Sequence, residues 1–126
     1  MLRLADVAVL VADQDEAMRF YCGVLGFEVV EDAFVDGKRW VKVRGGGAGL
    51  VLRTAKTDEQ RALVGKQAAR GVFLFVETDD FDATYARLRG HGVVFVEEPR
   101  HEPYGTVVVF LDPYGNKIDL IQPAIP

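Results

Sequence analysis

The stretch Tyr104–Pro123, YGTVVVFLDPYGNKIDLIQP, contains two apolar runs separated by turn-forming residues. The runs are Val107–Leu111 and Ile118–Ile121, and both are rich in β-branched or aromatic side chains, which favour strands. The joint contains Pro113, whose ring fixes φ near a turn value, and Gly115, which tolerates positive φ. The stretch therefore predicts a β-hairpin.

One carboxylate, Asp119, interrupts the second apolar run between Ile118 and Leu120. Successive side chains of a strand alternate between its two faces, so Asp119 points away from the face that its two neighbours share. That face is either in contact with water or lines a binding site. The sequence leaves both possibilities open, together with a hydrogen bond from Asp119 to a neighbouring strand.

The same layout occurs earlier, at Trp40–Arg53, and each hairpin is preceded by an apolar strand and an amphipathic helix. The helices have apolar residues at one-face spacing over 17–25 and 81–88. An offset of about 67 positions superimposes the halves and pairs Asp13 with Asp80. A doubled unit of this kind predicts two similar modules.

Helix boundaries are marked in both halves. Asp13 is a predicted N-cap with Glu16 three residues later, and Asp79–Asp80 precede the second helix. The first helix is predicted to end at Gly26 and the second at the segment 90–92.

The remaining strands complete a β-α-β-β-β order in each half. Asp36–Gly37 predicts a hairpin turn, and the polar segment Lys56–Arg70 predicts a linker with a short helix. We expect one domain, with a first module at about 1–55, a linker at about 56–70 and a second module at about 71–126. Further strands are expected at 7–12, 27–31, 40–43, 48–53, 72–76 and 93–96, with an irregular loop at 97–105.

Composition excludes several classes of protein. The chain has 126 residues and a formal net charge of −4, and its basic residues are scattered, which argues against nucleic-acid binding. We find no secretory leader and no apolar run long enough to span a membrane. The single cysteine, Cys22, cannot form an internal disulfide. We therefore expect a cytoplasmic protein without a nucleic-acid or membrane partner.

In their order and spacing, these motifs resemble the vicinal oxygen chelate superfamily, which includes glyoxalase I, the bleomycin-resistance proteins and extradiol dioxygenases. The resemblance implies an α+β fold of two βαβββ modules whose sheets curve into a cup, and a homodimer. The segments that carry it are Val11–Asp13, Ala17–Tyr21, Leu25–Phe27, Asp79–Ala83, Tyr104–Gly105 and Phe110–Asn116 with Asp119.

Metal-dependent members of that superfamily bind a divalent ion through the first and last strands of each module. The corresponding positions here are Asp6, Val51, Phe73 (or Val72) and Asp119. Apolar side chains have no lone pairs to donate, and two carboxylates fall short of the three or more protein ligands usual in a catalytic site. We predict no cofactor. A hard ion held by the two aspartates and water is the alternative.

Six residues are candidate ligand contacts: Trp40, Arg53, Phe73, Phe75, Tyr104 and Asp119. Arg53 has the strand parity of Val51, and its guanidinium suits a ligand carboxylate or phosphate. An ion pair with Glu77 or Asp119, or a solvated strand end, is the alternative for Arg53.

The aromatic candidates suit a planar apolar ligand. Plain core packing is the alternative for Phe73, Phe75 and Trp40. Tyr104, with His101 on the same loop, would meet a ligand at the rim of a site or remain an ordinary turn residue.

The sequence therefore favours a metal-free protein that binds a small, partly aromatic molecule, as the bleomycin-resistance branch does by sequestration. The alternative implied by the resemblance is a metal-dependent lyase, isomerase or dioxygenase. A non-catalytic structural role is the third hypothesis.

Overall fold

The computed structural model describes residues 1–125, so Pro126, the last residue of the predicted second module, lies outside the described residues. The chain divides into two compact units, residues 1–67 and a second unit that begins at Ala68. Within residues 1–125, no helix is long and apolar enough to cross a membrane. The expectation that both modules form one domain stays a prediction.

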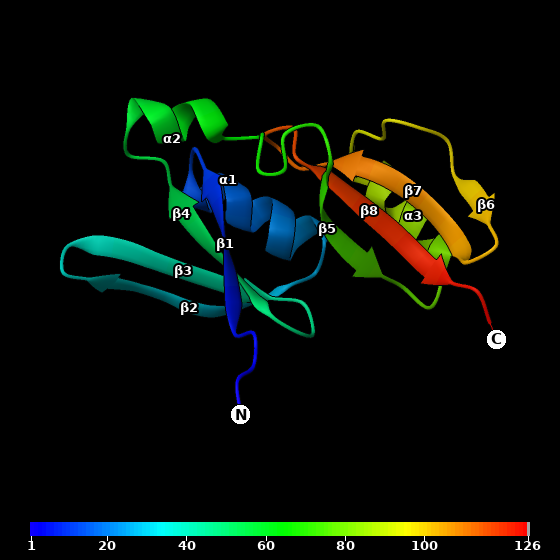
Figure 1. Ribbon diagram of the computed structural model, residues 1–126, viewed down its shortest axis with the longest axis horizontal. Coiled ribbons are helices and arrows are strands. Elements are labelled where there is room, and N and C mark those ends of the chain that lie inside the picture. The colour runs from blue at the N-terminus through cyan, green and yellow to red at the C-terminus, as the bar shows by residue number, and fades with distance from the viewer. Residues whose placement is uncertain (126) are drawn as a thin grey trace. The chain divides into compact units, whose positions relative to one another are not determined.

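Unit 1 is a four-stranded mixed sheet with two helical segments (Figure 1). Its strand order is β1-β4-β3-β2; β1 runs parallel to β4, and the other neighbours are antiparallel. The elements are β1 (Asp6–Val11), α1 (Gln14–Met18), its π-helical continuation η1 (Arg19–Val24), β2 (Glu28–Val35), β3 (Lys38–Arg44), β4 (Gly49–Thr54) and α2 (Asp58–Leu63).

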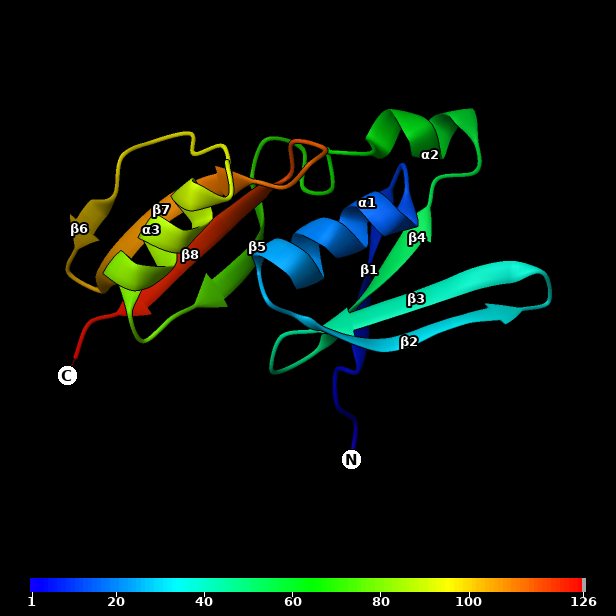
Figure 2. The ribbon, with the colours of Figure 1, turned by 180° about the vertical axis from the view of Figure 1, so that it is seen from behind.

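The first helix begins and ends where the sequence predicts. Asp13 Oδ1 accepts a hydrogen bond of 2.8 Å from the backbone N–H of Glu16, and Gly26 ends the helical segment at φ 83°. The segment widens in its second half, where the N–H of Leu25 donates to the carbonyl of Phe20, five residues back. Figure 2 shows α1 against the strands β1 and β4.

One face of this sheet forms the core of unit 1 with the helix. Its fully buried side chains come from alternating positions of β1, β3 and β4 and from the helical segment. They include Val9, Val11, Val41, Val43, Leu52, Ala17 and Tyr21. The two-residue turn between β2 and β3 has positive φ at Asp36 (52°) and Gly37 (76°), as a type I′ hairpin requires.

Unit 2 repeats the arrangement, with strand order β5-β8-β7-β6 and β5 parallel to β8. Asp80 caps its helix by accepting from the N–H of Ala83 (3.1 Å), and the Gln122 side chain accepts from the N–H of Phe81 (2.8 Å). Its elements are β5 (Val72–Glu77), α3 (Phe81–Gly90), β6 (Arg100–Glu102), β7 (Gly105–Leu111) and β8 (Lys117–Pro123).

A chain of aromatic rings packs α3 onto its sheet. Phe81 stacks on Tyr85 with ring centroids 5.8 Å apart, and Tyr85 meets Phe95 edge-on at 4.8 Å. Phe95 in turn lies 6.0 Å from Phe110 of β7, which is fully buried. These contacts account for the apolar stripe that predicted the helix.

The strand predicted at 93–96 is wrong in extent. Only Phe95 forms a bridge there, opposite Phe110, with hydrogen bonds from the N–H of Val96 to the carbonyl of Val109 (3.1 Å) and from the N–H of Leu111 to the carbonyl of Val94 (2.9 Å). The second strand of this module is instead β6, inside the segment predicted as an irregular loop. The ladder breaks because the Glu97 carboxylate, in place of a backbone carbonyl, accepts from the N–H of Val109 (3.0 Å), and Pro99 has no N–H to donate.

Each unit therefore has the βαβββ order, and the predicted α+β fold of two such modules is confirmed. The short helix expected in the 56–70 linker is α2.

The terminal hairpin turn depends on the buried carboxylate of Asp112, which is 4% exposed. Its Oδ1 accepts from the backbone N–H groups of Tyr114 and Asn116, both at 2.9 Å, and its Oδ2 accepts from Asn116 Nδ2 at 2.8 Å. The turn thus folds around one side chain that satisfies several donors.

We predict that Asp112→Ala lowers the free energy of unfolding by about 2–3 kcal/mol, because it leaves buried donors without an acceptor. Urea denaturation measures the change. Glu98→Ala, which removes an exposed carboxylate of the same unit, is the control and should change stability by less than about 0.5 kcal/mol. A similar loss for both variants would contradict this role of Asp112.

Candidate functional site

Each sheet has a second face, opposite its helix, which we call the open face of that unit. In unit 1 the strand register places side chains of β1, β3 and β4 on this face, in alternation with the core residues. They are Asp6, Ala8, Leu10, Lys38, Trp40, Lys42, Arg44, Val51 and Arg53. The predicted candidates Trp40 and Arg53 therefore share one face.

The strands β3 and β4 separate along this face, and we call the separated part, residues 38–41 and 52–54, the fork. Their pairing runs from Arg44–Gly49 to Lys42–Val51 and ends there. Figures 1 and 2 show the two strands adjacent at one end and diverging toward the other. Backbone groups that would otherwise pair across the sheet thus need other partners in the fork.

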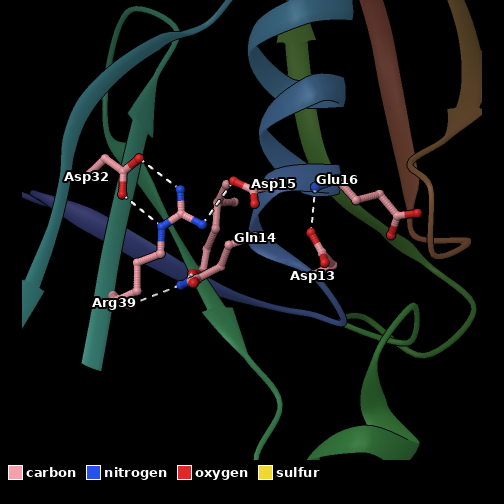
Figure 3. A network of polar contacts seen from close by, with 7 residues as sticks. Asp13, Gln14, Asp15, Glu16, Asp32 and Arg39 are labelled. Carbon is pink, nitrogen blue, oxygen red and sulfur yellow. Dashed lines mark hydrogen bonds and ion pairs between the residues drawn. The ribbon is translucent and has the colours of Figure 1, made fainter. Parts of the chain in front are cut away.

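The side chain of Gln14, the first residue of α1, bridges the fork. Its Nε2 donates to the carbonyl of Arg39 on β3 (3.1 Å; Figure 3). It also donates to the carbonyl of Leu52 on β4 (2.9 Å). One amide group therefore takes the place of missing ladder hydrogen bonds. The helix start and both strands are fixed together at this point.

Arg39 fixes the β2–β3 hairpin against the same helix start (Figure 3). Its guanidinium contacts Asp32 through two hydrogen bonds of 2.9 Å and Asp15 through an ion pair of 2.9 Å. The hydrogen bonds from Arg39 lower the pKa of Asp32, and those to the two carboxylates raise the pKa of Arg39.

A concavity of about 540 Å³ opens at the fork, within the size range of small-molecule sites. Its lining includes Trp40, which is 38% exposed, the apolar Val51, and the basic Lys38, Arg53 and Lys56. Two of the six predicted ligand contacts, Trp40 and Arg53, therefore line one cavity.

The paired end of the same face carries a compact charge cluster. Lys42 Nζ lies 3.1 Å from Glu31 and 3.4 Å from Asp6, and Arg44 lies 3.7 Å from Asp6. The hydrogen bond to Glu31, and a smaller one to Asp6, raise the pKa of Lys42. Gly49 makes room for the cluster, since a Cβ there would lie 2.6 Å from Asp6 Oδ1.

On the open face of unit 2, Asp119 pairs with Phe75 on one side and Val109 on the other. Its Oδ1 is buried and accepts no hydrogen bond from residues 1–125. This oxygen is therefore neither exposed to solvent nor hydrogen-bonded to a neighbouring strand. Burial raises the pKa of Asp119, and the nearby Arg100 guanidinium opposes the rise.

Arg100 is a site residue that the sequence reasoning missed. It forms ion pairs of 2.9 Å with Glu97 and with Glu102, and the Glu97 carboxylate is near enough to Asp119 to raise its pKa. Arg100 lies between Glu97 and Glu102 in the sequence, and this charge pattern could have indicated the ion pairs. Because 97–105 was predicted to be an irregular loop, the strand that begins at Arg100 was not anticipated.

The other candidates lie in unit 2 in different settings. Phe75 is 69% exposed beside Asp119, and Tyr104 is 56% exposed at the turn between β6 and β7. Phe73 lies at a register shift between Val72 and Leu74 and is only half-buried. Within unit 1, no side chain forms an ion pair or hydrogen bond with Arg53. The alternative of an ion pair with Glu77 or Asp119, which belong to unit 2, stays a prediction.

The residues at the four superfamily metal positions do not fit a divalent ion. Asp6 pairs with Gly49, two residues before Val51, and Val72 pairs with Lys117, two residues before Asp119. The strand register therefore makes Val72 the equivalent of Asp6. Neither Val72 nor Phe73 has a side chain that can bind a metal. Val51 has no such side chain either, and Asp6 already faces two cations. Among residues 1–125, no three His, Cys, Asp or Glu side chains are grouped to hold a metal.

A family model described as the Glyoxalase/Bleomycin resistance protein/Dioxygenase superfamily matches residues 3–120. The chain belongs to this superfamily. A protein of Shewanella frigidimarina is 43% identical over 124 residues, which are 94% of this chain and 92% of the relative.

Two solved structures resemble the chain over almost its whole length. The crystal structure of UcmS2 is 35% identical with a TM-score of 0.84, and covers 96% of this chain and 98% of its own. TnmS3, described as an antibiotic binding protein from Streptomyces sp. CB03234, is 31% identical with a TM-score of 0.78 and covers 98% of both chains.

We predict that Asp119→Asn becomes more stable relative to the wild type as the pH rises from about 3 to about 7. The folded-state pKa of Asp119 is raised above its ordinary value of 3.8, so the ionised carboxylate destabilises the fold. That destabilisation is absent below the unfolded-state pKa and complete above the folded-state pKa. Thermal unfolding at several pH values measures the difference.

Asp79→Asn, which removes an exposed carboxylate of the same unit, is the control for losing one negative charge. A difference between Asp119→Asn and wild type that stays constant or falls with rising pH would show that Asp119 is not destabilised by burial.

Proposed function

We propose that this protein binds a planar, partly aromatic small molecule and holds it without converting it. The observation that carries the proposal is the cavity at the fork, where Trp40 and Arg53 line one concavity of small-molecule size. The likeness to TnmS3, an antibiotic binding protein, supports an antibiotic as the ligand. Sequestration would then protect a cell by lowering the concentration of free ligand.

The proposed contacts are the six residues identified from the sequence. In unit 1, Trp40 supplies an aromatic ring and Arg53 supplies the several N–H donors of its guanidinium group. In unit 2, Phe75 and Tyr104 present exposed rings, Phe73 a half-buried one, and Asp119 a carboxylate oxygen without a partner among residues 1–125.

We propose that binding requires no metal. Two of the four superfamily positions hold apolar side chains, and the charge cluster around Asp6 supplies cations where an ion would need anionic ligands. The alternative, a metal-dependent lyase, isomerase or dioxygenase, lacks the donors it needs, so we assign no reaction step.

Titration calorimetry of the purified protein against a panel of aromatic antibiotics tests the proposal. We expect at least one to bind with the same affinity in EDTA and in added Zn²⁺, Ni²⁺ or Mn²⁺, and to be recovered unchanged by mass spectrometry. Conversion of a bound compound, or binding that EDTA abolishes, would contradict a metal-free binding protein.

Trp40→Ala should weaken binding of the planar ligand about tenfold or more, equivalent to about 1–3 kcal/mol of lost aromatic burial. Calorimetry with the same ligand measures the change. Leu63→Ala is the control, because Leu63 is an exposed apolar residue of the same unit that does not line the cavity. Equal affinity in Trp40→Ala and wild type would show that the ligand does not bind at the fork.

We also propose that the protein is a homodimer. β2 is an edge strand that is exposed along its whole length, although it contains Val29, Val30, Phe34 and Val35. An apolar edge of this kind is stabilised when a second copy covers it, and a twofold pair uses the same patch twice.

Light scattering should give a mass near twice 13.9 kDa, and Phe34→Asp should shift it toward the monomer. A wild-type mass near 13.9 kDa that does not depend on concentration would contradict the dimer. A dimer that persists in Phe34→Asp would place the interface away from β2.

A further inference from the structure

The cavity at the fork carries positive charge that the rest of unit 1 leaves unpaired. The side chains of Lys38, Arg53 and Lys56 line it, and none of them forms a hydrogen bond or ion pair within unit 1. By contrast, Arg39 and Lys42 are each paired with two carboxylates.

The acidic residue that lines the cavity does not cancel this charge. Asp6 already lies 3.4 Å from Lys42 and 3.7 Å from Arg44, at the end of the open face where β3 and β4 are paired. The cavity is therefore positive, although the chain as a whole carries a net charge of −4. A local field of the opposite sign to the whole chain favours an anionic ligand.

Trp40 lies across the fork from Arg53. The antiparallel register that pairs Lys42 with Val51 would place Trp40 opposite Arg53 two residues further along, where the strands have separated. Both side chains are on the open face and both line the cavity. An indole ring on one strand and a guanidinium group on the other suit a ligand with an aromatic ring that bears a carboxylate.

Resting on the proposed function, we propose that the fork selects aromatic carboxylates, with Arg53 as the residue that binds the carboxylate and Trp40 as the residue that contacts the ring. Lys38 and Lys56 add a longer-range attraction. A cationic aromatic ligand would enter a cavity with three unpaired positive charges, and it is disfavoured there.

A pair of matched probes tests this selectivity: 2-naphthoate, and its neutral analogue 2-naphthamide, which has the same ring and nearly the same shape. By titration calorimetry in low salt, we expect 2-naphthoate to bind at least tenfold more tightly. Its affinity should fall in 0.5 M NaCl, while that of 2-naphthamide should change less than twofold.

Arg53→Gln should reduce the affinity for 2-naphthoate about tenfold or more and that for 2-naphthamide less than twofold. Arg53→Lys keeps the charge but loses the two-donor geometry, so it should have an intermediate effect. Arg19→Gln is the control, because Arg19 is an exposed arginine of the same unit that does not line the cavity. Circular dichroism checks that each variant is folded.

The outcomes separate the two proposals. Equal affinity for both probes, unchanged by Arg53→Gln but lowered by Trp40→Ala, overturns the selectivity for carboxylates and leaves the binding of aromatic molecules intact. Binding of neither probe, with an aromatic antibiotic of the panel still bound, overturns the selectivity for carboxylates alone. Binding of neither probe and of no antibiotic overturns both proposals. Loss of 2-naphthoate affinity in Arg19→Gln as large as in Arg53→Gln would show that net charge, rather than Arg53, attracts the anion.

Discussion

The cavity in unit 1 depends on a hydrogen-bonding constraint, namely that backbone groups exposed by a gap in a sheet must find other partners. Gln14 meets it by donating to carbonyls of both strands from the first residue of a helix. The strands can therefore stay apart without leaving these carbonyls unsatisfied. Arg39 strengthens the same point by joining the β2–β3 hairpin to Asp15. A cavity thus opens where a continuous sheet would have paired.

The open faces place cationic side chains beside the carboxylates at the superfamily's metal positions. In unit 1, Lys42 and Arg44 approach Asp6, and in unit 2 Arg100 lies near Asp119. Each carboxylate that could have approached an ion has a cationic side chain nearby instead. These contacts compensate the negative charge of each carboxylate.

Most of the fold could be predicted because its signals are local. Caps, helical spacing and turn residues act over a few positions, and the structure has the predicted N-cap hydrogen bonds at Asp13 and Asp80 and the predicted turn at Gly37. The failure at 93–96 has a long-range cause, because the carboxylate of Glu97 takes a hydrogen bond from Val109 on another strand. Propensity contains no information about such a contact.

The sequence by itself determined the doubled βαβββ order, the apolar side chains at two metal positions and the identity of the six candidate residues. Strand alternation alone was enough to place Trp40 and Arg53 on one face. Only the tertiary structure decided that β3 and β4 diverge, that Arg53 has no ion-pair or hydrogen-bond partner within unit 1, and that Asp119 Oδ1 is buried. The reason is physical: pairing, burial and charge compensation depend on residues far apart in the chain, whereas periodicity and capping depend on neighbours.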